Sequence, residues 1–341
     1  MTKGTKIFRI IISVILMLSV LWTAFTFTAM WVLGTRFIHT QEYGIYVAGV
    51  SVTRTNKNDI LGDGTVYYDD DYNVLVFDNA VIESENTIIY SYRDLIIGLY
   101  GENKFVCPNT EFMTAIYASD YTLAKDLYFE GDGSLLIEFP NATGDAMAIY
   151  GSKITFSADV TIEMPDCSNI ANGIVCESSL LMLNQSTLTV INGSAKYSTA
   201  LGVRGNAQID HGSTINITTR PGTTDSCKGI FTDGDLIVGN GSALNVSIDD
   251  ETAKFSECIN VSGLFDIGEG ATVTASSKKT TAIECYGAIE LNTDANVSAS
   301  TADKETDILC YGAVVNYGAT VDADINALCG IHNMTENADQ Q

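Results

Sequence analysis

Basic residues and proline are both scarce in this chain of 341 residues. It carries 18 lysines and arginines against 42 aspartates and glutamates, a formal net charge of −24. Because the chain offers no cationic surface for phosphates, nucleic-acid binding is disfavoured. Only four prolines beside 29 glycines exclude collagen and proline-rich linkers. The apolar share is nevertheless 46%, unlike that of a disordered acidic tail, so the chain is able to bury a core.

Acidic residues are absent from the first forty positions, which form a separate segment. Its basic residues are Lys3, Lys6, Arg9 and Arg36, so residues 41–341 carry a net charge of −28. Residues 10–33 are 24 uncharged positions, which as a helix would span about 36 Å, enough for a hydrocarbon core of about 30 Å. The cations before this run favour a cytoplasmic N-terminus and export of the rest. We therefore predict a single-pass signal-anchor helix in the cell membrane, with residues 41–341 extracellular.

The alternative is a signal peptide that is cleaved after export. Such a peptide has an apolar stretch of about 7–15 residues, followed by a cleavage site with small residues on both sides of one arbitrary residue. The apolar stretch here is longer, and the candidate residues Ala24 and Ala29 are preceded two positions earlier by Trp22 and Phe27. The sequence therefore favours a retained anchor and leaves cleavage open.

Apolar residues recur at long intervals through the rest of the chain. We call the first one in each repeat its anchor; the anchors are Ile149, Ile174, Leu201, Ile230, Ile259, Ile283 and Ile308, at intervals of 25, 27, 29, 29, 24 and 25 residues. The positions 6, 8, 14 and 16 residues after the anchors are also mostly apolar, and around them apolar residues alternate with period two, as in strands. Three short strands per repeat with matched apolar positions indicate coils stacked into parallel sheets around one core.

The sequence thus predicts an all-β fold, a right-handed parallel β-helix of about ten coils after one transmembrane helix. Ile89 and Ile116 extend the anchors upstream, and Leu328 is expected to start a short last coil. Glycine stands four residues after five anchors, at Gly205, Gly234, Gly263, Gly287 and Gly312. We expect the bend there to need a backbone angle open mainly to glycine. A β-sandwich of evenly spaced strands is the alternative, although antiparallel hairpins do not require such matched columns.

Residues 41–80 differ from the repeats and are expected to cap the open end of the stack. Residues 66–68 and 74–77 flank the acidic turn 69–73, a pattern typical of a hairpin. The predicted organisation is a cytoplasmic stub and anchor over 1–40, a cap over 41–80, the β-helix over 81–330 and a polar tail over 331–341.

Residues 47–53, 58–69 and 75–80 read VAGVSVT, NDILGDGTVYYD and LVFDNA. They resemble the opening of a family of bacterial surface proteins, usually V-G-G-V-x-V-T, D-V-L-G-D-G-T-V-x-Y-D and L-T-L-N-N-A. These proteins, mostly from gut Gram-positive bacteria, are often described as carbohydrate-binding-domain-containing or pectate-lyase-like β-helices. The resemblance is specific over residues 45–82, where Ala48 replaces a usual glycine. It implies a right-handed β-helix on a bacterial cell surface and says little about chemistry.

A set of catalytic residues is not evident in the sequence. A glycoside hydrolase needs paired carboxylates on adjacent coils, but the acidic runs 69–71 and 249–251 fall in expected loops, where such runs are usually solvated. A lyase needs a base, and the arginine candidates are Arg204 and Arg220. His211 lacks the companion Arg-x-Lys of polygalacturonases, and the three histidines are too dispersed for a metal cluster. We predict no catalytic residues and no cofactor, with at most weak calcium binding by the acids.

Three of the eight cysteines, Cys176, Cys285 and Cys310, stand two residues after an anchor. Other repeats place small, mostly apolar residues there, which favours free thiols that point into the core. Cys285 and Cys310 should be neighbours, so a disulfide in an exported chain stays open. The absence of Cys-x-x-Cys spacing disfavours zinc and thioredoxin-like chemistry.

The loops between the last strand of one coil and the next anchor vary in length, and such loops usually carry recognition. Tyr286 and Tyr311 each precede a column glycine and should stack as an outward aromatic ladder, unless they pack under a loop. The candidate ligand-binding residues are Tyr286, Tyr311, Arg220, Asp249, Asp250 and Tyr197. We predict a non-catalytic binding or adhesion module for a cell-surface or host carbohydrate. The alternatives are a polysaccharide lyase or glycoside hydrolase, and a structural protein of the cell envelope.

Overall fold

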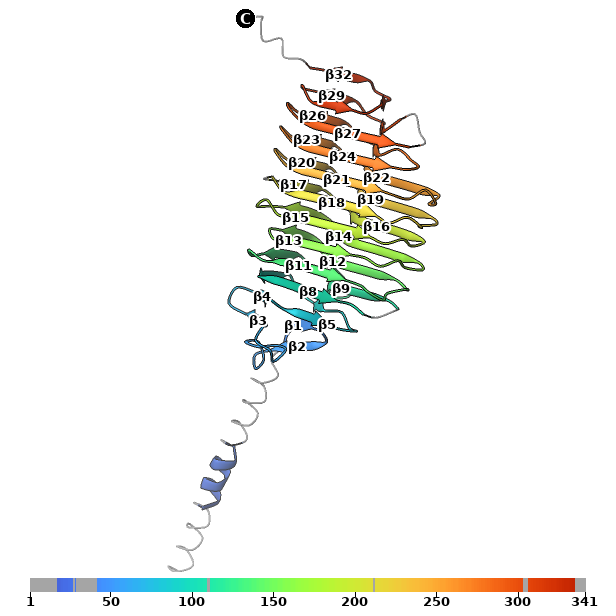
Figure 1. Ribbon diagram of the computed structural model, residues 1–341. Coiled ribbons are helices and arrows are strands. Elements are labelled where there is room, and N and C mark those ends of the chain that lie inside the picture. The colour runs from blue at the N-terminus through green and yellow to red at the C-terminus, as the bar shows by residue number, and fades with distance from the viewer. Residues whose placement is uncertain are drawn as a thin grey trace, which may run out of the picture.

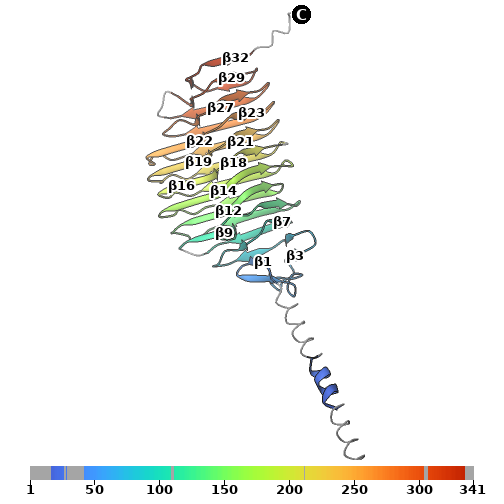
Figure 2. The ribbon, with the colours of Figure 1, turned by 180° about the vertical axis from the view of Figure 1, so that it is seen from behind.

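A computed structural model describes residues 17–26, 28, 42–108, 111–210, 212–302 and 306–334. Between residues 42 and 334 the chain forms a parallel β-solenoid of about nine turns, whose coils follow one another from β1 to β32 (Figure 1). Seen from behind, the strands again form stacked rows along one long axis (Figure 2). The predicted parallel coil is confirmed, with about nine turns in place of about ten.

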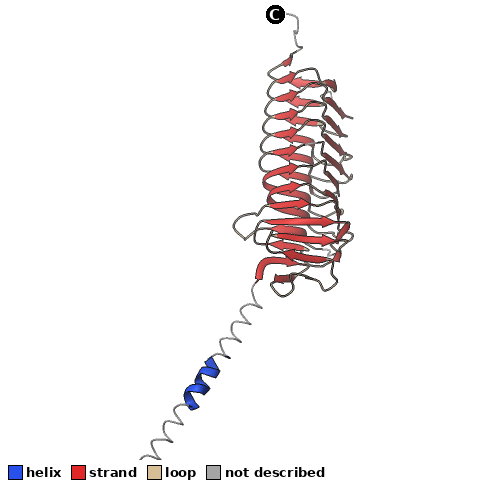
Figure 3. Cartoon of the chain, turned by 90° about the vertical axis from the view of Figure 1, so that its left-hand side faces the viewer, coloured by secondary structure: helices blue, strands red, loops and turns tan. Residues whose placement is uncertain are grey.

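Each regular coil contributes strands to three columns, two of which the side view separates clearly (Figure 3). The first column holds the anchors and comprises β6 (Ile89–Ser91), β9 (Met113–Ala118), the first part of β12 (Ala146–Phe156) and of β14 (Ile170–Met182), β16 (Tyr197–Val203), β19 (Ser226–Thr232), β22 (Phe255–Val261), β25 (Ile283–Cys285), β28 (Ile308–Cys310) and β31 (Ile325–Ala327). The second comprises β4 (Val74–Asp78), β7 (Leu95–Tyr100), β10 (Leu127–Glu130), the later parts of β12 and β14, β17 (Ala207–Ile209), β20 (Leu236–Val238), β23 (Phe265–Ile267), β26 (Ile289–Leu291), β29 (Val314–Asn316) and β32 (Ile331–Asn333). The third comprises β5 (Val81–Glu83), β8 (Glu102–Val106), β11 (Ser134–Glu138), β13 (Asp159–Glu163), β15 (Thr187–Asn192), β18 (Thr214–Thr219), β21 (Ala243–Ile248), β24 (Thr272–Ser277), β27 (Asn296–Thr301) and β30 (Thr320–Asp322).

The register of the first column follows the anchors. Each of the seven anchors pairs with the next, from Ile149 with Ile174 to Ile283 with Ile308, and all are buried. A shift of the pairing register by one residue would move every inward apolar side chain of a strand to the solvent face. The apolar pattern alone therefore specifies this pairing. The last anchor, however, is Ile325, which pairs with Ile308. The expectation for Leu328 is wrong, because its side chain is exposed.

Glycine occupies the five column positions for a physical reason other than the predicted one. None of them has a positive φ. A Cβ at Gly287 would instead lie 2.2 Å from the carbonyl oxygen of Gly263, and one at Gly312 would lie 2.3 Å from that of Gly287. The backbone of one coil thus approaches the next too closely for any side chain. The expected special backbone angle is wrong, and close coil-to-coil contact is the cause.

The cap closes the first coil with antiparallel pairing. β1 (Glu42–Val47) pairs antiparallel with both β2 (Val50–Thr53) and β6, and β3 (Val66–Asp69) pairs antiparallel with β4 across the acidic turn. This turn is held by Asp70, which pairs with Lys57 and accepts a hydrogen bond from the Tyr43 hydroxyl. The outer edge of the first coil is therefore covered by strands that end the parallel stack.

The termini lie largely outside the described residues. In the described part of the chain the only helix covers residues 17–26, and no helix there is long and apolar enough to cross a membrane. The predicted anchor over 10–33 falls mostly on residues that the structure does not describe. At the other end, 331–333 form β32 in place of the start of a polar tail, and residues 335–341 are not described.

Candidate functional site

Tyr286 and Tyr311 form an outward aromatic pair on adjacent coils. Their ring centroids are 4.8 Å apart with an interplanar angle of 1°, and the residues are 50% and 39% exposed. The Tyr311 hydroxyl donates to Oε1 of Glu284 at 3.3 Å, and the charge of Glu284 raises the pKa of Tyr311. Because the two rings lie flat against each other, the two ring faces between them are covered.

A second group of tyrosines lies near the capped end and was not among the predicted site residues. We call it the tyrosine cluster; its members are Tyr46, Tyr90, Tyr92, Tyr117, Tyr121 and Tyr150. Tyr90, Tyr117 and Tyr150 are in register on β6, β9 and β12, each one residue after an anchor. The repeat pattern already contained this signal, since the position after each inward anchor must point outward.

The rings of the tyrosine cluster meet at mixed angles. Tyr117 stacks on Tyr150 at 4.9 Å and 13°, whereas Tyr90 is tilted by 33° from Tyr117 at 5.4 Å. Tyr46 and Tyr92 meet nearly at right angles, at 6.0 Å and 82°. In an edge-to-face contact the edge of one ring lies against the face of the other, which is a favourable geometry for aromatic rings. The cluster therefore presents rings in several orientations, of which the Tyr121 ring is exposed and the other five are half-buried.

A projecting loop completes the cluster on one side. Tyr121, at 81% exposure, lies in this loop, and its hydroxyl is 2.6 Å from that of Tyr92. Lys125 and Asp120 pair at 2.6 Å across the loop, and the lysine is the main cause of the lowered pKa of Asp120. The ion pair and the hydroxyl contact hold Tyr121 beside the other rings.

Charged groups border the cluster on the following coils. Glu177 and Arg204 pair at 2.8 Å on β14 and just after β16. Burial, followed by the charge of Glu177, raises the pKa of Tyr150, so its hydroxyl is protonated at neutral pH. The cluster thus combines apolar ring surface with hydroxyl groups and a carboxylate–guanidinium pair. Such a set suits a ligand that has both apolar faces and hydroxyl groups.

Arg220 lies in a separate cavity of about 670 Å³, beside the loops that follow β11 and β13. Its Nη1 donates to the carbonyl oxygen of Met164 at 3.4 Å. Glu138 and Glu163, on neighbouring coils in register, also line the cavity, together with Asp166. Glu138 is paired with Lys104 at 2.7 Å. The cavity is therefore acidic, with one guanidinium group in its wall.

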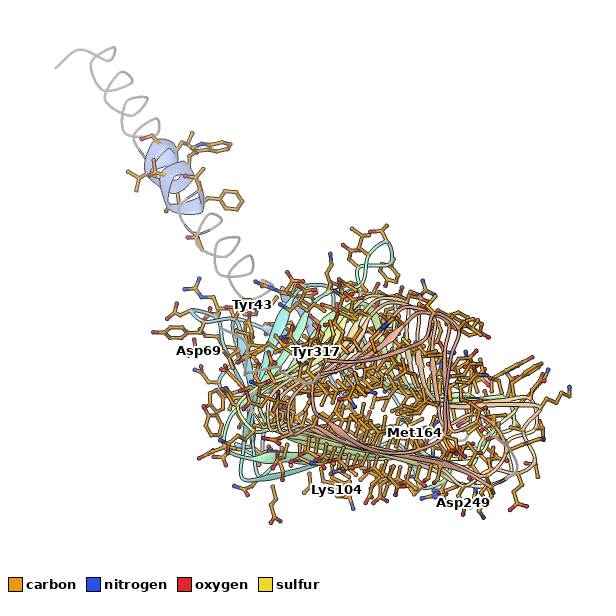
Figure 4. The ribbon with its side chains drawn as sticks, turned by 90° about the horizontal axis from the view of Figure 1, so that it is seen from above. Tyr43, Asp69, Lys104, Met164, Asp249 and Tyr317 are labelled. Carbon is orange, nitrogen blue, oxygen red and sulfur yellow. The ribbon has the colours of Figure 1, made fainter. Side chains whose placement is uncertain are left out.

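The two neighbouring aspartates of the predicted set have different environments. Asp249 lies at the outer edge of the solenoid, where its side chain is 48% exposed and pairs with Lys278 (Figure 4). Asp250 is buried, and its carboxylate accepts hydrogen bonds from the backbone N–H groups of Thr223 at 2.7 Å, Thr252 at 2.7 Å and Ala253 at 3.2 Å. The structure thus places Asp250 inside the loop that it organises, away from the solvent-exposed surface.

Tyr197 belongs to a small charged group at the start of β16. The Nζ atom of Lys196 lies 5.0 Å from the centre of the Tyr197 ring. Asp225 pairs with Lys254 at 3.2 Å, and this lysine, helped by the Tyr197 hydroxyl, lowers the pKa of Asp225. Of the six predicted residues, Tyr286 and Tyr311 contact each other through their rings. No described ring contact joins this pair to Tyr197, Arg220, Asp249 or Asp250.

A further groove, of about 520 Å³, lies along the second column. Asp210, Asp266 and Glu269 line it together with the amides of Asn240 and Asn292. Burial raises the pKa of Asp266, although Nδ2 of Asn292 donates to its Oδ1 at 2.8 Å and opposes the rise. Over the described residues, no three His, Cys, Asp or Glu side chains are grouped so that they could hold a metal ion.

Many acidic residues serve the coil itself. Their Oδ1 atoms accept a hydrogen bond from a backbone N–H of the next coil, at 2.7–3.1 Å. These residues are Asp94, Asp126, Asp145, Asp159, Asp166 and Asp235. Aspartate is short enough to bridge two coils at a bend without disturbing either strand. Part of the negative charge is therefore explained by backbone hydrogen bonding between coils.

The cysteines are free thiols, and most point inward. Cys285 and Cys310 are in register and buried, and each Sγ donates to a column-glycine carbonyl of the preceding coil, at 3.4 Å to Gly263 and 3.3 Å to Gly287. The predicted inward thiol column is confirmed, and no disulfide joins this pair in the structure. Burial raises the pKa of most of these thiols, that of Cys107 to about 12.

We expect one fast-reacting thiol in the native protein. Cys329 is the one cysteine that is exposed, Cys167 is half-buried, and the other six are buried. A disulfide-exchange reagent should therefore label Cys329 at once, Cys167 slowly and the rest only after unfolding. Titration with Ellman's reagent before and after denaturation measures this; fewer than eight thiols in the denatured, unreduced protein would contradict the free-thiol assignment.

Comparison of the chain with protein-family models, with curated proteins and with solved structures gave no match. The fold and the surface therefore define the class: a parallel β-solenoid with exposed tyrosines on the outer face of its first column.

Proposed function

We propose that this protein is a non-catalytic carbohydrate-binding module, displayed outside the cell on an N-terminal membrane anchor. The observation that carries the proposal is the tyrosine cluster, in which tilted rings, hydroxyl groups and a flanking ion pair lie on one outer face. A sugar ring has an apolar C–H face and a rim of hydroxyls. Tilted tyrosines match both, because an exposed ring face packs on the C–H face while hydroxyls bond the rim.

The charge of the module narrows the ligand class. Residues 41–341 carry a net charge of −28, which repels polyanions at physiological ionic strength. Uronic-acid polymers and other anionic polysaccharides are therefore poor ligands. A neutral glycan chain is the ligand class that the surface supports best.

Two further features support display outside the cell. The uncharged run 10–33 follows three basic residues, the pattern of an anchor with a cytoplasmic N-terminus. The resemblance of residues 45–82 to bacterial surface proteins also supports display outside the cell.

We further propose that the coil is right-handed, because connections between parallel strands of one sheet are right-handed in nearly all proteins.

The proposal is tested with the full chain in a mild detergent, screened against an array of neutral and anionic glycans. We expect binding to a neutral glycan, weakened about five- to tenfold by Tyr117→Ala or Tyr121→Ala, because one aromatic contact contributes about 1 kcal/mol. Tyr286→Ala is the matched control, since it removes an exposed tyrosine far along the same column. Absence of neutral-glycan binding, or an equal loss in the control, would overturn the proposal.

One observation favours polysaccharide cleavage as a second candidate function. Asp266, whose pKa is raised by burial, lies in the groove with Asp210 and Glu269, and glycoside hydrolysis uses carboxyl groups placed in different environments. Assays for new reducing ends and for unsaturated products separate the two functions. Turnover that is lost in Asp266→Asn would replace the binding-only proposal with an enzyme.

A further inference from the structure

The outward position one residue after each anchor stays uncharged beyond the tyrosine cluster. On successive coils it holds Tyr90, Tyr117, Tyr150, Val175 and Gly202, which pair in register along the first column. Each of them is half-buried, so part of its surface is open to solvent. We call these five residues the track. Residues 41–341 carry a net charge of −28, so an uncharged row across five coils is a distinct strip of this surface.

Both ends of the track are marked by other rings. At the capped end Tyr46 of β1 lies opposite Tyr90, and the two rings meet at 6.3 Å and 85°. At the other end the next residue in register is Phe231, and Nζ of Lys228 lies 4.4 Å from the centre of its ring. The four coil steps from Tyr90 to Gly202, at about 4.8 Å each, give the track a length of about 19 Å.

Polar groups flank the track on both sides. Asn172 and Thr199, in register on neighbouring coils, lie on one side of Val175 and Gly202. On the other side Glu177 and Arg204 form their ion pair, in which the arginine side chain is 66% exposed. Because the two charges of this pair neutralise each other, it offers hydrogen bonds without favouring a charged ligand.

Gly202 stands on the track without a structural need for glycine. Its φ is not positive, and an added Cβ would meet Cγ2 of Thr199 at 3.7 Å and no described backbone atom closer than 3.9 Å. At the column glycine Gly205, by contrast, a Cβ would lie 1.9 Å from the carbonyl oxygen of Ser178. Glycine weakens a strand, and inside one it marks a place where a ligand or another backbone comes close. Since the described backbone leaves room over Gly202, a ligand that passes over it explains this glycine.

We propose that the track binds one linear neutral glycan lengthwise, along the solenoid axis, through several successive sugar units. This inference rests on the proposed function and adds the direction and the length of the ligand. The rings of Tyr90, Tyr117 and Tyr150 follow one another at 5.4 Å and 4.9 Å, so their hydroxyl groups recur from coil to coil. A linear glycan repeats its hydroxyl groups along its length in the same way. A pyranose unit is about as long as one coil step, so the full track takes about five units.

Titration calorimetry of the full chain in a mild detergent tests the length of the ligand. The probes are cello-, manno-, xylo- and malto-oligosaccharides, each from the disaccharide to the hexasaccharide. For the sugar that binds, we expect the affinity to rise at least about tenfold from the disaccharide to the pentasaccharide and then to level off. The reason is that each added unit contacts one further coil until the track is covered.

Gly202→Gln tests the path of the ligand. The long uncharged side chain would stand in the way of a chain that passes Gly202, so the gain from the disaccharide to the pentasaccharide should be lost. Disaccharide binding at the tyrosines should persist, which also verifies the fold of the variant. Thr218→Gln is the matched control, because it places the same side chain on an exposed outward position of β18, in the same coil as Gly202.

The outcomes separate this inference from the proposed function. An affinity that is already complete with the disaccharide would overturn the track and leave carbohydrate binding in place. So would pentasaccharide binding that Gly202→Gln leaves unchanged, or that Thr218→Gln weakens equally. If no neutral oligosaccharide of any length bound, both the track and the proposed function would be overturned.

Discussion

Replacing Gly287 by alanine is expected to lower the free energy of unfolding by about 3 kcal/mol or more. The added Cβ would lie 2.2 Å from the carbonyl oxygen of Gly263 and 2.6 Å from its carbonyl carbon. The obstacle is backbone, so no side-chain rotation relieves it and two coils must separate locally. The carbonyl of Gly287 also accepts the N–H of Gly312 at 3.0 Å, so the disturbance extends to the next coil. Chemical denaturation followed by circular dichroism measures the change.

Gly202→Ala is the matched control for this prediction. Gly202 lies in β16 of the same solenoid, has no positive φ, and its added Cβ would meet nothing closer than 3.7 Å. Its alanine variant should unfold within about 0.5 kcal/mol of the parent protein. If both variants lost a similar free energy of unfolding, the general loss of glycine flexibility would explain the effect of Gly287→Ala. Close contact between coils would then not be the reason for glycine at the column positions.

Asp250→Ala is expected to lower the free energy of unfolding by about 2–4 kcal/mol. The buried carboxylate accepts backbone hydrogen bonds from Thr223, Thr252 and Ala253 and one from the Thr252 hydroxyl at 2.8 Å. Alanine would leave these donors without partners in a buried loop, which is more costly than losing an exposed interaction. Asp249→Ala is the control, since its exposed pair with Lys278 should contribute less than about 1 kcal/mol.

The pH dependence of this effect has a definite sign. Burial raises the pKa of Asp250, but the hydrogen bonds from Thr252, Thr223 and Ala253 outweigh it and leave the pKa below its ordinary value. A carboxyl whose folded pKa is depressed stabilises the fold fully above the unfolded pKa of about 3.9, and this contribution is lost as pH falls through the folded pKa. The difference between parent and Asp250→Ala should thus be constant above about pH 5 and shrink as the pH falls below about 4, through the lowered folded pKa; a difference that grows on acidification would contradict the assignment.

The candidate sites show how far a repeat pattern reaches. Tyr286 and Tyr311 were found because they occupy one position of neighbouring repeats, and their flat stacking follows from in-register strands. The same rule, applied one residue after Ile89, Ile116 and Ile149, would have found Tyr90, Tyr117 and Tyr150. Tyr121 would still have been missed, because it comes from a loop that folds back onto Tyr92. Loop residues have no periodic constraint, so their partners are not encoded in spacing.

The sequence by itself determined the coil, its register and its inward columns. The reason is that side chains alternate across a strand and that a slip of one residue would expose a whole apolar face. Only the tertiary structure decided why glycine stands in its column, since the obstacle at Gly287 is the backbone of another coil, 24 residues earlier. It likewise separated Asp249 from Asp250, adjacent in sequence, into a solvent-exposed ion pair and a buried acceptor. Close approach and burial arise from contacts between segments distant in sequence, and local patterns do not carry that information.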